Sequence, residues 1–416
     1  MTEATRMETP AQTADAGPDV DPDTIAQENA EMVTDIAIIG AGPVGMTLAL
    51  ALAGGPHKVV LIDRQARGAW AADPRALALS HGTRQLLERL GAWNAAAGTE
   101  IRDIHVSQRG GLGRTQIDAA DYALPALGYV MRYRDLAAAL AGALTRPAPD
   151  IDLLDESELL GIDSAADPAL APTLTVRRHG VAQRIAARLV VHAEGTPTKD
   201  PGVTVRDYRQ HAVLAEVRPA PGHRHRAWER FTPDGPLALL PLGEDYSVVF
   251  TVPPEKAAHL LALDDAGFLA ALRAQFGSRL DFVASGPRVA YPLALRMRRA
   301  LMQTRQVWIG NAAQTLHPVS GQGFNLGLRD AWELAEALLA DGADPGAAAP
   351  LAAYARGRRA DRMGSATFTD GIVRLFSNDL PPLRALRGLG LLALDLYPPL
   401  RHFVAKRMIW GARAWP

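Results

Sequence analysis

The alternation of apolar and polar positions predicts a β-α-β unit near the start of the chain. Val33–Ile39 is a short apolar run that ends at Gly40, and Val59–Ile62 is a second apolar run. Between them, apolar residues recur with helical spacing from Pro43 to about Ala53. Because a helix joins the two runs, we expect them to form parallel strands with a right-handed connection.

Further along the chain the pattern changes from helical spacing to strand alternation. Residues 81–92 and 134–145 have helical spacing, and Leu189–Val191 is an apolar run typical of a buried strand. Between about 205 and 300, four segments alternate apolar and polar positions and are separated by turn sequences. These segments are His211–Val217, Arg224–Phe231, Leu237–Pro241 and Tyr246–Val252. We interpret them as an antiparallel sheet beside the α/β part.

The first pattern returns after residue 300. Val307–Ile309 is another buried strand, and residues 324–341 and 350–376 have the spacing of long helices. The predicted fold class is therefore α/β, with an inserted antiparallel-sheet domain and C-terminal helices.

Composition narrows the functional classes. The 416 residues include 44 Lys or Arg and 45 Asp or Glu, a net charge of −1 that argues against nucleic-acid binding. Cysteine is absent, which excludes disulfides, cysteine nucleophiles and thiolate-bound metals. No apolar run reaches the roughly 20 residues of a membrane span, and the start lacks the features of a secretory signal. We therefore expect a cytoplasmic protein.

The first 31 residues differ in composition from the rest of the chain. They hold eight acidic residues and one basic residue, Arg6, and they show no apolar periodicity. Such an acidic segment is typical of a disordered tail. A docking arm is the alternative interpretation.

A glycine-rich loop joins the first strand to the first helix. The run Gly40-Ala41-Gly42-Pro43-Val44-Gly45 matches G-x-G-x-x-G. Its glycines allow a tight turn, a close approach of the backbone to a pyrophosphate, and close helix–strand packing. Asp63 lies 23 residues after Gly40 at the end of the second strand, where an acidic residue binds a ribose hydroxyl. The loop predicts a Rossmann-like dinucleotide-binding domain without distinguishing FAD from NAD.

A second match to the glycine pattern has a different context. Gly388–Ala393 fits G-x-G-x-x-A but follows a basic helical stretch and not a strand. We therefore interpret its glycines as packing positions or as a helix break.

A second glycine-rich segment lies far downstream of the first. Gly310–Asp330 follows the apolar strand Val307–Ile309 and begins a helix. Backbone N–H groups around Gly321–Gly323 could bind a negative group at the helix N-terminus. Two such helix starts indicate one long ligand that contacts both. In a flavoenzyme the second contact would be the N1–C2=O edge of the reduced isoalloxazine.

These segments resemble the single-component FAD-dependent aromatic hydroxylases, the family that includes para-hydroxybenzoate hydroxylase. Within that family the chain is most similar to the ubiquinone-biosynthesis branch, which includes 2-polyprenyl-6-methoxyphenol hydroxylase. The resemblance rests on Gly310–Asp330 and on three further strings, and it covers roughly residues 33–416. The strings are Asp73–Ser80, Glu229–Ala238 and Ala290–Leu295.

The resemblance implies how the chain divides. The expected parts are the acidic tail 1–31, the FAD-binding domain in two parts (32–204 and 301–345), the antiparallel-sheet substrate domain 205–300 and a C-terminal helical region 346–416.

The resemblance also implies a set of FAD-binding residues. The glycine loop Gly40, Ala41, Gly42, Pro43, Val44 and Gly45 would hold the pyrophosphate, and Asp63, followed by Arg64, would bind the adenosine ribose. The second segment contributes Asn311, Pro318, Gly321, Gln322, Gly323 and Asn325. Arg75 matches a position that contacts FAD near its pyrophosphate, and a surface salt bridge is its alternative. Arg134, at a helix start, is a further candidate, with a role outside the site as its alternative.

Two positions depart from the family pattern. The wider family has Gly-Asp at Gly310-Asn311, where the acid accepts hydrogen bonds from the ribitol. Asn311 can accept one hydrogen bond and donate others, but it carries no charge. The ubiquinone-biosynthesis branch tolerates Asn at this position. The run His192-Ala193-Glu194-Gly195 replaces the usual Ala-Asp-Gly, so a cofactor contact by Glu194 is left open.

The resemblance implies a reaction cycle carried by the cofactor. NAD(P)H reduces FAD as a transient reductant, O2 adds at flavin C4a as co-substrate, and the hydroperoxyflavin transfers oxygen to a phenol ring. No acid or base can be assigned from the sequence. His317 is the one weak catalytic candidate, and a structural hydrogen bond is its alternative. His223 and His225 lack a third ligand, so we expect no metal.

The implied substrate is a polyprenylated phenol of the 2-polyprenyl-6-methoxyphenol type. Because it is nearly all apolar, we expect a pocket lined by the sheet at 211–252 and by a loop at Tyr291–Leu293. The stretch Gly388–Leu400 and the basic residues after it could contact a membrane peripherally, or could pack on the flavin domain. Those residues are Arg401, His402, Lys406 and Arg407.

Two alternatives stay open. The chain could hydroxylate a soluble aromatic compound, or it could be a non-catalytic scaffold that works with other quinone-biosynthesis proteins. Asn311 and Glu194 are the features that keep the second alternative open.

Overall fold

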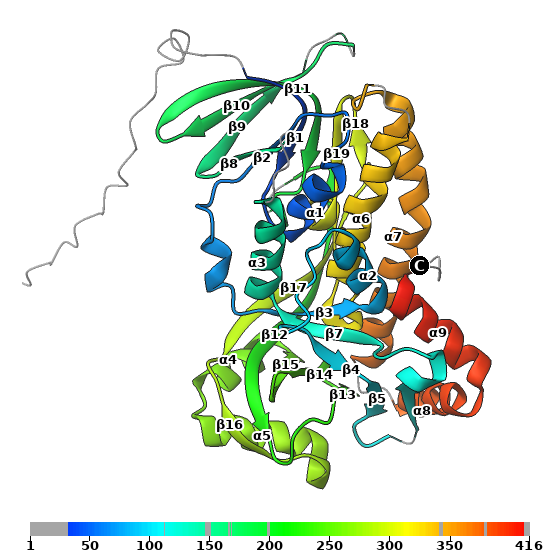
Figure 1. Cartoon of the computed structure of the whole chain (residues 1–416). Coiled ribbons are helices and arrows are strands. Elements are labelled where there is room, and N and C mark those ends of the chain that lie inside the picture. The colour runs from blue at the N-terminus through cyan, green and yellow to red at the C-terminus, as the bar shows by residue number, and fades with distance from the viewer. Residues whose placement is uncertain are drawn as a thin grey trace, which may run out of the picture.

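The computed structural model describes residues 32–111, 113–145, 151–164, 167, 169–197, 200–340, 344–377 and 381–411. The predicted acidic tail, residues 1–31, lies outside the described residues. Two large sheets occupy opposite ends of an elongated molecule (Figure 1). The long helices α6 (Gln322–Leu339) and α7 (Ala348–Phe376) run along one side, from the first sheet toward the second (Figure 1).

The upper sheet in Figure 1 contains the predicted β-α-β unit. Its central strand pairs in parallel on both sides, so that Ile36 lies between Val59 and Leu189. In spatial order the strands are β18 (Met302–Gln303), β19 (Gln306–Trp308), β11 (Val181–His192), β1 (Met32–Ile39), β2 (Val59–Ile62) and β8 (Ile151–Leu154). Two more strands, β10 (Thr173–Arg178) and β9 (Ser157–Asp163), continue from β11 in antiparallel order.

Successive residues of β1 point to the two faces of this sheet. Ile36 and Ile38 pack in the main core with residues of α1 (Pro43–Leu52), α3 (Tyr133–Leu144) and α6. Ala37 and Ile39 pack on the other face with residues of β10. The structure confirms four predicted helices to within two residues at each end. Their predicted ranges are 43–53, 134–145, 324–341 and 350–376.

A small third sheet lies between the two large ones (Figure 1). Its strands are β3 (Ala76–Ser80), β7 (Gly128–Arg132) and β4 (Thr99–Ile101). Helix α2 (His81–Arg89) follows β3 directly. The Ser80 hydroxyl caps this helix by accepting a hydrogen bond from the Thr83 amide at 3.2 Å. The predicted helix 81–92 ends three residues early.

The lower sheet in Figure 1 contains the four segments with predicted strand alternation. In spatial order its strands are β20 (Gln314–Thr315), β17 (Val289–Arg298), β12 (Val203–Pro219), β15 (Asp245–Val252), β14 (Pro236–Leu242), β13 (Arg226–Phe231), β5 (Asp103–Gln108) and β6 (Arg114–Asp118), with β16 (Phe282–Ser285) beside β12. Helices α4 (Pro254–Ala262) and α5 (Asp265–Phe276) pack on one face, where Phe268 is fully buried.

The sheet is not entirely antiparallel, because β13 pairs in parallel with β5. Strands β5 and β6 thus join the same sheet as β12 to β17, although they lie much earlier in the chain. The domain limits at 205 and 300 remain a prediction, and the pairing of strands does not follow them.

Two helices end the described chain, α8 (Pro381–Leu396) and α9 (Pro398–Trp410). Gly388 and Gly390 lie inside α8, so the predicted helix break is wrong. A Cβ on Gly113 would overlap the Gly388 carbonyl oxygen, so Gly113 packs directly on the backbone of α8, whereas a Cβ on Gly390 would meet no atom within 4 Å. In the part of the chain that the structure describes, no helix has the length and apolar character needed to cross a bilayer.

Candidate active site

Two close approaches, at Gly40 and Gly45, shape the first glycine loop. Gly40 has a φ of +105°, a value that side-chain-bearing residues rarely adopt, and a Cβ there would overlap Ala193. A Cβ on Gly45 would overlap the carbonyl oxygen of Gly40. At Gly42 the nearest atom would be the Tyr133 hydroxyl, 3.7 Å away. The loop is thus tightly packed at Gly40 and Gly45 and leaves room for a ligand at Gly42.

Asp63 lies beside this loop, at the end of β2. Its Oδ2 accepts a hydrogen bond from the Ala41 amide at 2.6 Å, and its Oδ1 accepts one from the Gln65 amide at 2.8 Å. No side chain caps the first turn of α1, so that turn has unpaired N–H groups. The loop therefore places amide donors and a carboxylate together, as a pyrophosphate and a ribose require. Arg64 is exposed next to Asp63, and its role remains a prediction.

Arg75 forms the salt bridge that its alternative interpretation predicted. Its Nη2 lies 2.6 Å from Oδ2 of Asp73, and its guanidinium lies 4.8 Å from the centre of the Tyr133 ring. Because the Tyr133 hydroxyl is close to Gly42, Arg75 also lies near the glycine loop. Arg134 is half exposed and lies 3.9 Å from Asp135. Cofactor contacts by Arg75 and Arg134 remain predictions.

The second segment packs directly against the first. A Cβ on Gly310 would lie 3.1 Å from the Val44 side chain, and a Cβ on Gly327 would lie 3.1 Å from Cα of Gly310. These small residues bring α1, α6 and the turn at Gly310–Ala312 together. The exposed Asn311 follows Gly310, so the two predicted loops meet at one place.

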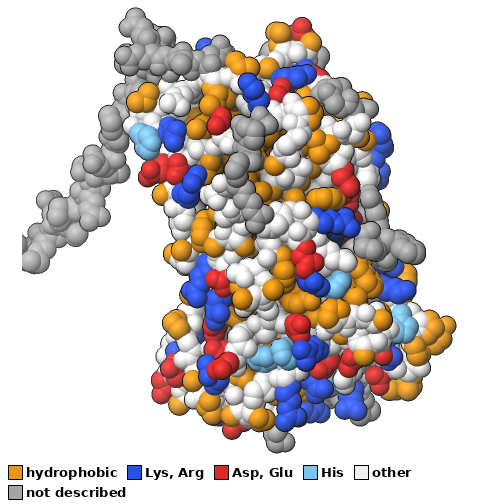
Figure 2. Space-filling model, viewed as in Figure 1, with side chains coloured by type: hydrophobic (Ala, Val, Ile, Leu, Met, Phe, Trp, Pro, Cys, Tyr) orange, Lys and Arg blue, Asp and Glu red, His pale blue; other side chains and the backbone are white. Residues whose placement is uncertain are grey.

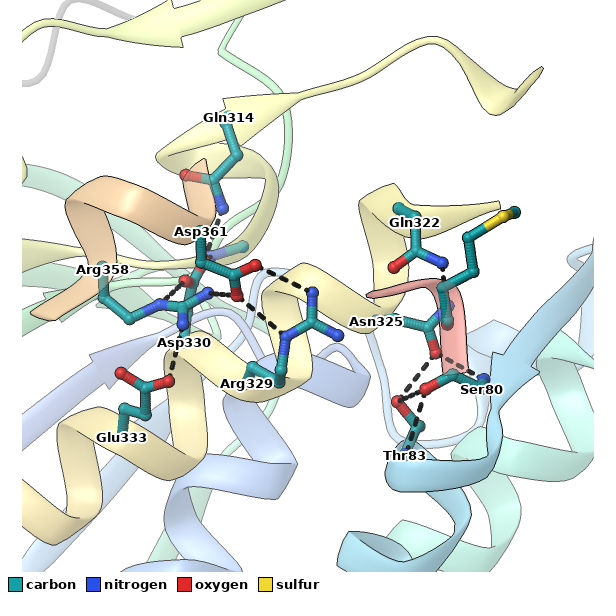
Figure 3. Close-up of polar contacts among 12 residues, drawn as sticks. Ser80, Thr83, Gln314, Gln322, Asn325, Arg329, Asp330, Glu333, Arg358 and Asp361 are labelled. Atoms are coloured by element: carbon teal, nitrogen blue, oxygen red, sulfur yellow. Dashed lines mark hydrogen bonds and ion pairs between the residues drawn. The ribbon is translucent and has the colours of Figure 1, made fainter. Parts of the chain in front are cut away.

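The N-terminus of α6 is uncapped and faces a cavity. Gly321 precedes the helix with a φ of +59°, and no side chain caps the first turn, which includes Gln322 and Gly323. Gly321 and Gln322 line the cavity, together with Pro318. Gln322 also donates a hydrogen bond to the Met408 carbonyl at 3.1 Å, which joins this loop to α9 (Figure 3).

Asn325 holds the loop in place through both ends of its amide. Its Oδ1 accepts hydrogen bonds from the Ser80 amide at 2.9 Å and from the Thr83 hydroxyl at 2.8 Å (Figure 3). Its Nδ2 donates to the carbonyls of Ala78 at 2.9 Å and Gly321 at 2.7 Å. These bonds make Asn325 a positioning residue, and a direct contact with the cofactor remains a prediction.

A buried charge network lies further along α6 (Figure 3). Asp330 accepts hydrogen bonds from the Gly310 amide at 3.1 Å, from Gln314 at 2.5 Å and from Arg358 at 2.7 Å. Arg358, on α7, is itself fully buried and also contacts Glu333 and Asp361. The network connects the second loop to α7. The sequence marked Asp330 as the last residue of a motif but gave it no role.

The cavity lies among the lower sheet, the loop Pro318–Gln322 and α9. Its volume is about 170 Å³, and most of its lining is apolar. The sheet contributes side chains such as Ile104, Ile117 and Leu240, and α9 contributes Ala405, Met408 and Ile409. The predicted lining by the sheet between 211 and 252 therefore agrees with the structure.

The predicted loop at Tyr291–Leu293 is wrong, and its place in the substrate pocket remains a prediction. Tyr291–Leu293 belong to strand β17, not to a loop, and they are not among the residues that line this cavity. The other walls come from β5, β6 and α9, elements whose position depends on contacts between distant parts of the chain.

His317 directly precedes the loop Pro318–Gln322 and is not among the residues that line this cavity. Its Nδ1 accepts a hydrogen bond from the Val319 amide at 3.1 Å, and its ring packs edge-on against Tyr208 at 5.2 Å. The residue is only 1% exposed, and burial lowers the pKa of its ring to about 4. This geometry agrees with the structural alternative, and catalysis by His317 remains a prediction.

The segment that departs from the family pattern is also held in place. Nδ1 of His192 lies 3.1 Å from Oε1 of Glu194, and its Nε2 lies 3.0 Å from Gln306. The His192 ring stacks on Trp308 with centres 4.6 Å apart. Glu194 is thus directed toward His192. Within the described ranges, no group of three His, Asp or Glu side chains could hold a metal ion.

The fold and the two glycine-rich loops are those of a flavoprotein. The chain belongs to the FAD binding domain family, which it matches over residues 33–368. It is an FAD-dependent monooxygenase, and the predicted cofactor and α/β fold class are confirmed.

Two relatives and one solved structure place the chain more closely. Ubiquinone hydroxylase UbiL of Rhodospirillum rubrum is 36% identical over 403 residues, 93% of this chain and 92% of that protein. 3-Demethoxyubiquinol 3-hydroxylase of Escherichia coli is 32% identical over 377 residues, 87% of this chain and 95% of that protein. The p-nitrophenol 4-monooxygenase of Pseudomonas putida shares the fold with a TM-score of 0.76 at 18% identity, over 92% of this chain and 100% of that chain.

Proposed function

We propose that the chain hydroxylates the aromatic ring of a polyprenylated phenol of ubiquinone biosynthesis. The observation that carries this proposal is the apolar cavity beside the loop Pro318–Gln322. A ring held against that loop would lie next to the flavin edge that the α6 N-terminus is expected to bind. The two ubiquinone-pathway relatives support the same substrate class.

The residues present fit FAD. The glycine loop has room at Gly42 and is fixed by contacts at Gly45, and the Asp63 carboxylate lies beside it. The uncapped N-terminus of α6 supplies amide donors at a second point. When bound, FAD supplies the transfer of one oxygen atom from O2 with electrons from NAD(P)H. The chain's own residues bind the cofactor, orient the ring and exclude water from the cavity.

We also propose that α8 and α9 contact a membrane peripherally. Their exposed apolar residues include Leu396 at 71% and Phe403 at 55%, and the basic residues Lys406 and Arg407 are exposed nearby. Figure 2 shows hydrophobic side chains at the lower right, where Figure 1 places α9. Because Ala405 and Ile409 of the same helix line the cavity, a prenyl chain could pass from lipid into the site along α9.

Substrates of graded prenyl length test the proposal. For the FAD-loaded protein, we expect KM to fall as the first isoprene units are added to a phenol and then to level off as the cavity fills. Each buried methylene contributes about 0.8 kcal/mol, so one unit changes KM by at least an order of magnitude. An equal KM for phenols with and without a prenyl group would favour the soluble-substrate alternative.

A further inference from the structure

One acidic residue lies in the middle of the apolar wall of the cavity. Glu229 is on β13, where it is paired with Val106 of β5 on one side and with Ala238 of β14 on the other. Directly paired residues point to the same face of a sheet, so Glu229 projects into the cavity between two apolar side chains. All three residues line the cavity.

The wider face around Glu229 is apolar as well. Ala227 lies two residues earlier on the same strand and is paired with Ile104 of β5. On the far side of β14, Ala238 is paired with Val249 of β15. Across five strands, from Ile117 of β6 to Val249 of β15, Glu229 is the one ionisable side chain that lines the cavity among the residues the structure describes.

One oxygen of the Glu229 carboxyl lacks a hydrogen-bond partner among the described residues. This oxygen, Oε1, is shielded from solvent. Burial raises the pKa of this carboxyl to about 8, so the group is mainly neutral at pH 7. A neutral carboxyl can donate one hydrogen bond and accept others. A buried polar group without a partner is costly, so its presence in an apolar wall points to a ligand that supplies the partner.

We propose that Glu229 binds the ring hydroxyl of the substrate and thereby sets which ring carbon faces the flavin loop. This inference rests on the proposed function and deepens it. Prenyl groups and aromatic carbons fit the apolar surface in many orientations, whereas a hydrogen bond at one fixed point restricts the ring to few. The loop Pro318–Gln322 forms another wall of the same cavity, so an anchor at Glu229 fixes the ring relative to that loop.

A comparison of two ligands that differ only in the hydroxyl tests the proposal. The probes are a phenol and a benzene that carry the same short prenyl chain. Their binding to the FAD-loaded protein is measured from the change in the visible flavin spectrum. We expect wild type to prefer the phenol by about tenfold, the value of one buried hydrogen bond. We expect Glu229→Leu to lose that preference and Glu229→Gln to retain part of it.

Leu240→Val is the matched control. It removes one methylene from the same wall and should weaken both probes by the same factor, so their ratio stays as in wild type. Because Leu is similar in size to Glu and suits an apolar wall, Glu229→Leu should unfold at a temperature equal to or above that of wild type. A second readout is the hydroxylated product formed per NAD(P)H consumed, which should fall further in Glu229→Leu than in Leu240→Val.

The outcomes separate the two proposals. If wild type prefers the phenol and Glu229→Leu keeps the full preference, the role of Glu229 is refuted and the proposed function stands. If wild type binds neither probe and forms no ring-hydroxylated product, the proposed function fails, and the inference fails with it.

Discussion

Arg358 donates a hydrogen bond through Nε to the carboxylate of Asp330 at 2.7 Å, and both side chains are completely buried. The same carboxylate accepts the Gly310 amide, so a charge pair between α6 and α7 holds the start of the second cofactor loop. Without Asp330, Arg358 would keep Glu333 and Asp361 as acidic partners, whereas the Gly310 amide would lose its acceptor.

We expect Asp330→Ala to lower the free energy of unfolding by about 1–3 kcal/mol and to weaken FAD binding, because the Gly310 amide and the Arg358 Nε lose the acceptor that they share. Urea unfolding with FAD titration measures both effects. Glu158→Ala, which breaks an exposed pair with Arg177, should cost less than about 1 kcal/mol. Equal costs for the two variants would refute a special role for Asp330.

Two glycines of the first loop should respond differently to the same substitution. A Cβ on Gly45 would overlap the Gly40 carbonyl, so Gly45→Ala should unfold the protein or displace α1. Gly42→Ala places its Cβ 3.7 Å from the nearest atom, so the apoprotein should keep its stability. It should nevertheless lose affinity for FAD, because the methyl group would occupy the space that we expect the pyrophosphate to take. Thermal unfolding and FAD binding distinguish these effects, and tight FAD binding by Gly42→Ala would contradict this account.

Acid should destabilise the protein through His317. The unfolded ring has a pKa of 6.5 and the buried ring about 4, so between these values the unfolded chain binds the extra proton. Stability is therefore full above pH 6.5 and declines as the pH falls toward 4, by on the order of 3 kcal/mol. His317→Asn keeps an acceptor for the Val319 amide but should show a flatter decline. The pKa of His105 is also lowered to about 4, by burial and by Arg279, Arg114 and Arg226. His105 therefore adds to the same acid sensitivity, and its contribution remains in this variant. An unchanged slope in His317→Asn would show that His317 does not titrate in this way.

The exposed face of α9 should govern membrane binding. Phe403→Ser removes an apolar side chain that is 55% exposed, so we expect it to reduce co-sedimentation with anionic lipid vesicles several-fold. Val283→Ser, at a site on β16 that is 62% exposed, is the matched control and should leave vesicle binding unchanged. If Phe403→Ser binds vesicles as wild type does, α9 is not the contact surface.

The sequence predicts the parts of the site that depend on local structure. A glycine loop after a strand and before a helix can be recognised within a few dozen residues, and Gly40–Gly45 and Asp63 lie as that pattern requires. The second loop is equally local. Its contact with the first, through Gly310 and Val44, follows once both helices pack on one sheet.

The parts of the site that the sequence does not predict depend on contacts between distant segments of the chain. β13 lies beside β5, although more than a hundred residues separate them, and this pairing brings Val106 and Glu229 together. Glu229 begins one of the segments that resemble the family, yet only the strand register shows that its side chain enters the cavity. Asp330 likewise gains its role from Arg358, which reaches it when α7 packs on α6.

The most direct test of the central claim is oxygen labelling. The FAD-loaded protein is supplied with NAD(P)H, a short-chain prenylated phenol and oxygen-18 gas, and the product is analysed by mass spectrometry. The account predicts one labelled oxygen atom on the aromatic ring of the product. NAD(P)H oxidation that yields only hydrogen peroxide, or a label found on the prenyl chain and not on the ring, would contradict it.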